Sequence, residues 1–138
     1  MCIRDRFDNA RETRLRLIGF TLYQRMEIME DCRTALITLS KDDLERFEVQ
    51  TGDTEGLVNY GLSIQGIRLA VLIIDRTKLV KMSFRSKGSF SVNEFARKHF
   101  QGGGHYNAAG GQSSETFEAT VARFKEVIRY YREELNEL

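Results

Sequence analysis

The sequence has little from which a metal centre or a disulfide framework could be built. Its 138 residues include only two cysteines, Cys2 and Cys32, and two histidines, His99 and His105. None of them stands at a metal-ligand spacing, and there is no HxxxH, CxxC or paired-aspartate motif. We therefore assign no metal ion or other cofactor to this chain. Both cysteines are expected to be free structural thiols, as in a reducing cytoplasm.

Long apolar runs are also missing. The longest, residues 69–74, has the length of a strand and falls far short of the roughly 18 to 20 residues that span a bilayer. The first sixteen residues carry five arginines and lack the apolar centre of a signal peptide. We expect a protein without a membrane span or an export signal, located in the cytoplasm.

An excess of charge of one sign is absent as well, because the formal net charge is +1. A general polyanion binder is thereby disfavoured, and any contact with nucleic acid must be local. With 41% hydrophobic and 30% charged residues, the chain is typical of a globular protein, and its length fits one domain. Neither a P-loop, a dinucleotide-binding fingerprint nor a nucleophile elbow is present.

The patterns that are present alternate between helix and strand. Apolar residues recur at helical spacing over residues 11–29, which predicts an N-terminal helix with one apolar stripe. A β-branched strand is predicted at 34–39. Ser40 and Asp43 form a capping box that starts a short helix to about residue 47, and Asp53 is expected to cap another short helix. The predicted stripe consists of Leu15, Ile18, Leu22, Met26 and Met29.

The second half begins with a nearly all-apolar strand at 67–75, covered on both faces, and a strand at 79–85 that returns after the turn "DRTK". Ser91 and Glu94 resemble a capping box, with Phe90 and Phe95 as a hydrophobic staple, so a helix is predicted at 92–100, ended by Gly102. A regular seam predicts a long C-terminal helix. The seam is Phe117, Val121, Phe124, Ile128, Tyr131 and Leu135. The fold class predicted is α/β, a mixed β-sheet flanked by helices.

The stretch "FQGGGHYNAAGG", residues 100–111, follows the predicted helix. Three glycines indicate that the backbone approaches something closely, because glycine has no Cβ to shield its N–H. A phosphate oxygen is the favoured guest, and a helical turn beginning at His105 would add its dipole. Tight packing of the loop is the alternative.

Two side chains stand beside this loop. His105 could donate to a phosphate oxygen or lie against a base. Arg85 ends a strand, where a guanidinium could grip phosphate through two N–H groups, or could simply be solvated. Tyr106 and Phe90 could stack on a base, although aromatic residues in such positions are more often core residues. His99 is expected to be a partly exposed helix residue.

The segments "FRSKGSFSVNEFARKHFQGGGHYNAAGG" and "DTEGLVNYGLSI" resemble the C-terminal substrate-binding domain of the DHH phosphoesterases, in particular the nanoRNase type. These are bifunctional oligoribonucleases and phosphoadenosine-phosphate phosphatases. The resemblance covers residues 11–138, and "GGGHYNAAG" is its specific core. It implies a nucleotide-binding domain whose site residues here are Arg85, Ser86, Gly102, Gly103, Gly104, His105 and Asn107.

The resemblance also implies an N-terminal catalytic domain with an Asp-His-His motif and two manganese or similar divalent ions. No such motif precedes Arg11, and "MCIRDR" is similar to translated sequencing adapter, so we expect a truncated reading frame. On this interpretation residues 1–33 hold a non-native start, the tail of the catalytic domain and a linker helix. Residues 34–138 are the substrate-binding domain. The chain alone should bind and not hydrolyse.

The partners expected are a short RNA or nucleotide phosphate and the missing catalytic domain. Part of the N-terminal apolar stripe would then lack its native partner, which allows a homodimer. The alternative function is a stand-alone nucleic-acid-binding module without hydrolase activity, since a related glycine-rich domain occurs in alanyl-tRNA synthetases. A steep salt dependence of binding would indicate that module, because many phosphates would be neutralised.

Overall fold

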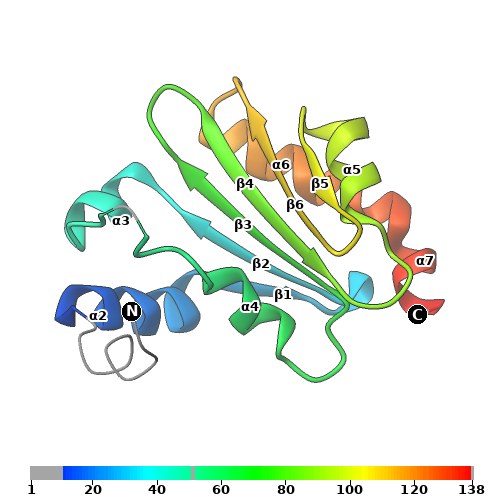
Figure 1. Ribbon diagram of the computed structural model, residues 1–138, viewed down its shortest axis with the longest axis horizontal. Helices are drawn as coiled ribbons and strands as arrows, with labels where there is room; N and C mark the ends of the chain where they lie inside the picture. Colours follow the sequence, from blue (N-terminus) through cyan, green and yellow to red (C-terminus); the bar gives the residue numbers. More distant parts are fainter. Residues whose placement is uncertain (1–10, 51, 138) are drawn as a thin grey trace.

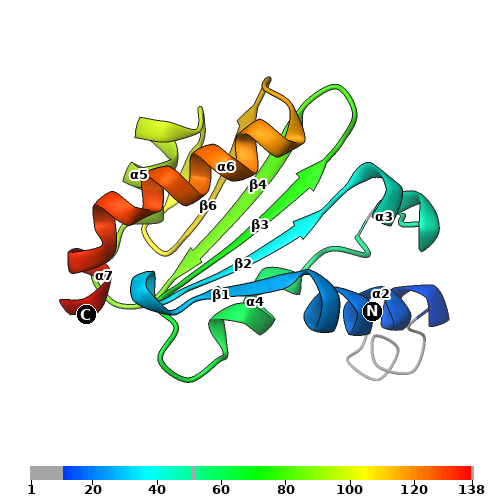
Figure 2. The same ribbon diagram turned by 180° about the vertical axis from the view of Figure 1, so that it is seen from behind.

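The structure is a computed structural model that describes residues 11–50 and 52–137. It shows a six-stranded sheet in the order β1-β2-β3-β4-β6-β5, with helices on both faces (Figure 1, Figure 2). Only β2 and β3 are parallel, and the other four neighbouring pairs are antiparallel. The predicted α/β class with a mixed sheet is confirmed. The strands are β1 (Met26–Met29), β2 (Thr34–Leu39), β3 (Leu69–Asp75), β4 (Val80–Ser86), β5 (Gly103–His105) and β6 (Ala108–Ser113).

Six α-helices lie in the described residues, none of them long and apolar enough to cross a membrane. A π-helical turn at Thr21–Arg25 extends the first, and short 3-10 turns occur at Glu30–Cys32 and Arg129–Tyr131. The helices are α2 (Glu12–Phe20), α3 (Lys41–Arg46), α4 (Leu57–Leu62), α5 (Val92–His99), α6 (Phe117–Ile128) and α7 (Arg132–Glu137).

The N-terminal helix ends earlier than predicted. Residues 26–29 form the edge strand β1, which pairs antiparallel with β2. In this extended conformation Met29 is buried in the core. The predicted stripe does not form one buried face either. Leu17 and Thr21 are the buried residues of this helical segment, whereas Leu15 is 56% exposed. The prediction of a single helix over residues 11–29 is therefore wrong, while the exposed apolar residue agrees with the predicted exposed surface.

Other local signals are confirmed. The Ser40 hydroxyl accepts from the Asp43 amide and the Asp43 carboxylate accepts from the Ser40 amide, so the capping box is complete. Asp53, in contrast, caps no helix. Its carboxylate accepts from the Gln50 amide and from Arg11, and α4 begins after Gly56 without a side-chain cap. The Asp53 prediction failed because an aspartate closes a tight loop through the same kind of bond that caps a helix.

Two apolar cores lie on the two faces of the sheet. On one face α5, α6 and α7 cover β3, β4 and β6, and the fully buried Phe84, Phe95 and Phe100 rings pack together there. On the other face α2 and α4 cover β2 and β3, with Leu17 and Leu57 against Ile37. The alternation along β4 explains this division, since Val80, Met82 and Phe84 point into the first core.

The C-terminal seam is confirmed residue by residue. Phe124, Ile128 and Leu135 are fully buried in the first core, and Phe117, Val121 and Tyr131 pack against it. One turn of 3-10 helix separates α6 from α7, so the long C-terminal helix is nearly continuous (Figure 2). Cys32 is a buried free thiol, as predicted, whereas Cys2 and the segment "MCIRDR" lie outside the described residues. The division between residues 33 and 34 stays a prediction, and β1 pairs with β2 across it.

Candidate functional site

The glycine-rich stretch is a β-hairpin. Strands β5 and β6 pair in the register Gly103↔Gly110, Gly104↔Ala109 and His105↔Ala108, with Tyr106 and Asn107 as the turn. The expected helical turn at His105 is therefore wrong. The reason is that β6 pairs with β4 and β5 pairs with β6, so this segment is held in an extended conformation.

Close packing explains several of the glycines. A Cβ on Gly102 would stand 2.0 Å from the Gly110 carbonyl oxygen, and one on Gly104 would stand 2.8 Å from the Ala108 carbonyl oxygen. On the core side, a Cβ on Gly111 would lie 3.1 Å from the Phe84 ring. The alternative of tight packing thus applies to these three positions, where a larger residue would meet backbone or a buried ring.

Two amides of the triplet already have partners. The Gly102 N–H donates to the Ala96 carbonyl at the end of α5 (3.2 Å), and the Gly104 N–H donates to the Asn93 side-chain oxygen (2.9 Å). In this structure neither N–H is available to a phosphate oxygen. The three glycines of the triplet stay predicted binding residues. The amides of Gly102 and Gly104 would first have to exchange partners.

Arg85 and His105 occupy one row across the sheet. Ala70 of β3, Arg85 of β4, Ala108 of β6 and His105 of β5 are consecutive partners in that row. They lie on the same face, because directly opposed residues point to the same side of a sheet. On this face α4 contacts β4, whereas β6 and β5 carry no helix of the described residues (Figure 1). The structure thus brings together the two charged or titratable residues that the sequence predicted.

The same face has a floor of small residues. Ser83 opposes Gly110, and one row further Lys81 opposes Gln112. A Cβ on Gly110 would meet nothing closer than the Met82 carbonyl oxygen at 3.6 Å, an ordinary contact, so packing does not require this glycine. We call this surface the β4–β6 face. It consists of Lys81, Ser83, Arg85, Ala108, Gly110 and Gln112.

Arg85 is held against its own strand. One terminal guanidinium nitrogen, Nη1, donates to the Phe84 carbonyl at 2.8 Å, and the residue is half-buried. His105 is exposed at the sheet edge. Since the guanidinium has five N–H groups, a single carbonyl leaves most of them for a ligand.

Ser86 is the last residue of β4, and Asn107 lies in the hairpin turn at the same end of the sheet. Ser86 is buried, and its hydroxyl donates to the Phe90 carbonyl while accepting from the Asn107 amide nitrogen at 2.9 Å. Asn107 also donates to the Gly88 carbonyl. The structure therefore separates these two predicted site residues from the β4–β6 face and shows them tying the hairpin turn to the loop after β4.

The two aromatic candidates for base stacking, Phe90 and Tyr106, differ in exposure. Phe90 is a core residue, 2% exposed, so stacking on a base is excluded for it. Tyr106 is 52% exposed, and its hydroxyl donates to the Ser89 carbonyl. His99 is half-buried on α5 as expected, and its Nε2 lies 2.7 Å from the Tyr131 hydroxyl. Burial, followed by the charges of Lys98 and Arg123, lowers the pKa of His99 below its ordinary value.

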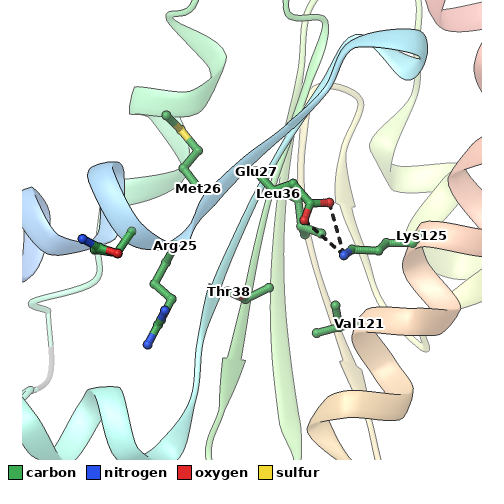
Figure 3. Close-up of a pocket in the computed structure, with 8 residues that line it drawn as sticks. Arg25, Met26, Glu27, Leu36, Thr38, Val121 and Lys125 are labelled. Carbon is green, nitrogen blue, oxygen red and sulfur yellow. Dashed lines mark hydrogen bonds and ion pairs between the residues drawn. The ribbon is translucent and has the colours of Figure 1, made fainter.

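A pocket of about 380 Å³ that the sequence did not indicate lies between β1, β2 and α6 (Figure 3). Lys125 of α6 reaches across it to Glu27 of β1, with nitrogen and oxygen 3.2 Å apart, while Thr38 and Val121 line its middle. Arg25 also lines it, but its guanidinium is paired with Asp43 at 2.8 and 3.1 Å. The charged groups of this pocket are thus paired, Lys125 with Glu27 and Arg25 with Asp43. No sequence signal marks a site that depends on the edge strand.

No three His, Cys, Asp or Glu side chains converge on a common point in the residues that the structure describes. The family resemblance assigns the pair of divalent ions to an N-terminal catalytic domain, and that assignment stays a prediction. We derive no step of chemistry through such ions in this chain.

Comparison with known proteins adds to this geometry. The family model of the DHHA1 domain matches residues 34–134. The bifunctional oligoribonuclease and PAP phosphatase NrnA of Bacillus subtilis (strain 168) is 34% identical over 107 residues, which are 75% of this chain and 33% of that protein. The chain thus spans about a third of the length of this curated relative.

Solved structures agree on the fold. An exopolyphosphatase-related protein from Bacteroides fragilis superposes with a TM-score of 0.90 at 37% identity, covering 97% of this chain and 39% of that one. The pGpG-specific phosphodiesterase PggH from Vibrio cholerae superposes with a TM-score of 0.61 at 13% identity, covering 98% and 43%, and shows the fold alone.

Proposed function

Because the chain belongs to the DHHA1 domain family, we propose that it is the nucleotide- and short-RNA-binding C-terminal domain of a metal-dependent DHH phosphoesterase. The substrate class is supported by the similarity to NrnA, whose name describes an oligoribonuclease and PAP phosphatase. Short oligoribonucleotides and phosphoadenosine phosphate share a phosphate next to a nucleoside, and that shared chemistry is what this domain would bind.

One observation carries the proposal: Arg85 and His105 lie in one row on the same face, with only Ala108 between them, and over β6 and β5 that face carries no helix of the described residues. The guanidinium would bind two phosphate oxygens in its planar fork. The imidazole would donate to the same phosphate or lie against the base. Ala108 and Gly110 leave the space between and beside them free of large side chains, which a nucleotide needs.

The remaining predicted residues would position this pair. Asn107 and Ser86 join the hairpin turn to the loop after β4, and the turn carries His105 at its start. The glycines bring β5 against β6 closely enough to place His105 beside Ala108. Ser86, Asn107, Gly102, Gly103 and Gly104 thus act mainly through the geometry of Arg85 and His105.

Hydrolysis is not assigned to this chain. Its described residues bring no metal-ligand set together, and its relatives are more than twice as long. In a full-length protein, a catalytic domain with two manganese or similar ions would supply activated water for hydrolysis, while Arg85 would hold the phosphate when the two domains close. The isolated chain would bind nucleotide and release no product.

Calorimetric titration with phosphoadenosine phosphate tests the proposal. Arg85→Ala and His105→Ala should each weaken binding by about 1 to 3 kcal/mol, the usual loss for a charge-assisted contact. Arg132→Ala, which removes an exposed arginine on α7, is the matched control and should bind like the parent chain. Unchanged affinity in both site variants would exclude the site, and clear turnover of short RNA by the isolated chain with manganese would exclude the division of labour.

A further inference from the structure

A second basic pocket lies at the end of β6 that is opposite to the Arg85 row. It has a volume of about 210 Å³ and is lined by the last residues of α5, the end of β6 and the first two turns of α6. Its charged side chains include Arg97, Lys98 and Arg123 against the single acid Glu115. The pocket therefore has an excess of positive charge on a chain whose net charge is only +1.

Arg123 is fixed in this pocket. Its Nη2 donates to the His99 carbonyl at 2.7 Å, and its guanidinium lies over the Phe100 ring, 5.1 Å from the centroid. Glu115 is a distant partner, with 3.9 Å between oxygen and nitrogen, and both side chains are about half exposed. An ion pair of this length and exposure contributes little. The guanidinium is thus preorganised, and a ligand anion could compete with Glu115 for it.

Arg97 lies next to the glycine hairpin. A Cβ on Gly103 would stand 3.2 Å from the Arg97 Nε, so this glycine makes room for the guanidinium. Within the described residues Arg97 makes no side-chain hydrogen bond or ion pair, and it is exposed. Arg97 is consequently a positive charge that the fold itself does not use.

Gln112 connects this pocket to the β4–β6 face. It lines the pocket and is also the partner of Lys81 in the ladder between β4 and β6. The Lys81 row and the Arg85 row are four positions apart on β4, which is about 13 Å at roughly 3.3 Å per residue. One phosphate cannot touch both places, whereas a chain with several phosphates can.

We propose that the pocket of Arg97 and Arg123 is a second phosphate-binding site, which holds a backbone phosphate of an oligoribonucleotide whose other phosphate is bound by Arg85 and His105. This inference rests on the proposed function. The ligand runs along the β4–β6 face from Arg85 to Gln112 and then passes around the end of β6 into the pocket, because α5 and α6 cover the opposite face of the sheet. The second site favours oligonucleotides over mononucleotides, and Glu115 weakens it by repelling phosphate.

Titrations of the 138-residue chain followed by NMR, which also measures weak binding, test this with two probes, adenosine monophosphate and penta-adenylate RNA. Arg97→Glu and Arg123→Gln should each weaken penta-adenylate binding about tenfold and leave the affinity for the monophosphate within about twofold. The slope of log affinity against log salt should become shallower by about 0.7 for each phosphate that the variant no longer neutralises. Glu115→Gln should strengthen penta-adenylate binding several-fold, while the control Arg132→Glu changes neither affinity.

The outcomes separate the two proposals. If Arg85→Ala weakens both probes but the pocket variants weaken neither, or weaken both equally, the second site is wrong and the proposed function stands. If Arg85→Ala leaves both probes unaffected, the proposed function fails and the second site fails with it. The Arg97 variant separates a loss of binding from a loss of folding, because that exposed side chain has no partner among the described residues to lose.

Discussion

Gly102 and Gly110 lie so close together that a Cβ on Gly102 would stand 2.0 Å from the Gly110 carbonyl oxygen, whereas a Cβ on Gly110 would make only an ordinary contact, 3.6 Å from the Met82 carbonyl oxygen. The lack of a side chain therefore has a different physical consequence at each of these two glycines. Gly102 lets the end of α5 turn directly onto β6. Gly110 leaves the β4–β6 face opposite Ser83 free of a side chain.

The first prediction concerns Gly102. Gly102→Ala should destabilise the fold by about 3 kcal/mol or more, the upper end of overpacking costs, because the clash is with backbone that cannot rotate away. Gly19→Ala is the matched control, since no atom lies within 4 Å of its added Cβ and the residue is within α2. That change should stabilise by about 0.5 to 1 kcal/mol. Urea unfolding measures both, and equal stabilities would contradict the close approach.

The second prediction concerns Gly110. Gly110→Val should leave the free energy of unfolding within about 0.5 kcal/mol, because a Cβ at this position makes only an ordinary contact and valine suits a strand. Binding of phosphoadenosine phosphate should fall at least about tenfold, because the isopropyl group fills the floor beside Arg85. Gly111→Ala, one residue on, faces the Phe84 ring and should lower stability instead. Full binding by Gly110→Val would place the nucleotide elsewhere.

The third prediction concerns the link between Ser86 and Asn107. Asn107→Ala and Ser86→Ala should each cost about 1 to 2 kcal/mol, because each leaves a polar partner unpaired in a partly buried loop. The double variant should cost clearly less than the sum of the two, since both remove one shared bond. A double-mutant cycle by thermal or urea unfolding checks this. Additive costs would show that the two residues act independently, as separate ligand contacts would.

The fourth prediction concerns acid stability. Burial by itself raises the pKa of Asp43, but the hydrogen bonds from Arg25 and from the Ser40 amide outweigh it, so the pKa of Asp43 lies below its ordinary value. Stability from such a group is complete above the ordinary pKa of about 4 and is lost as the pH falls through the lower folded-state pKa. Asp43→Asn should therefore be less stable at neutral pH and lose less stability on acidification.

Asp53, whose pKa is also lowered, keeps part of that acid dependence in the Asp43→Asn variant. Unfolding free energies between about pH 7 and 3 measure the effect. Parallel pH profiles for the two proteins would show that Asp43 is not held ionised by Arg25.

Local signals predicted most of the α/β frame. The strand at 34–39 and the Ser40 capping box depend on residues near one another in the chain, and both are found as predicted. The seam from Phe117 to Leu135 needed only the helical period. The strand at 67–75 is two residues shorter at its start, because Ile67 belongs to the turn before β3.

The site was predicted less completely. Arg85 and His105 were named from the motif, and the structure places them in one row. Arg97 and Arg123 could not be joined from the sequence, since they meet only where α5 ends beside α6. The sequence favours phosphate contacts for the glycines and leaves tight packing as the alternative, because a glycine needed for close packing and one needed for a ligand look the same in a sequence.

By itself the sequence determined most of the elements, the Ser40 capping box and the buried seam of the C-terminal helix, because these follow from spacing along one segment. Only the tertiary structure decided that residues 26–29 leave the helix to become an edge strand and that the glycine segment is a hairpin. Both outcomes depend on hydrogen bonds to strands distant in sequence, β2 and β4. A strand gains its backbone partners from other segments, whereas a helix finds them within itself.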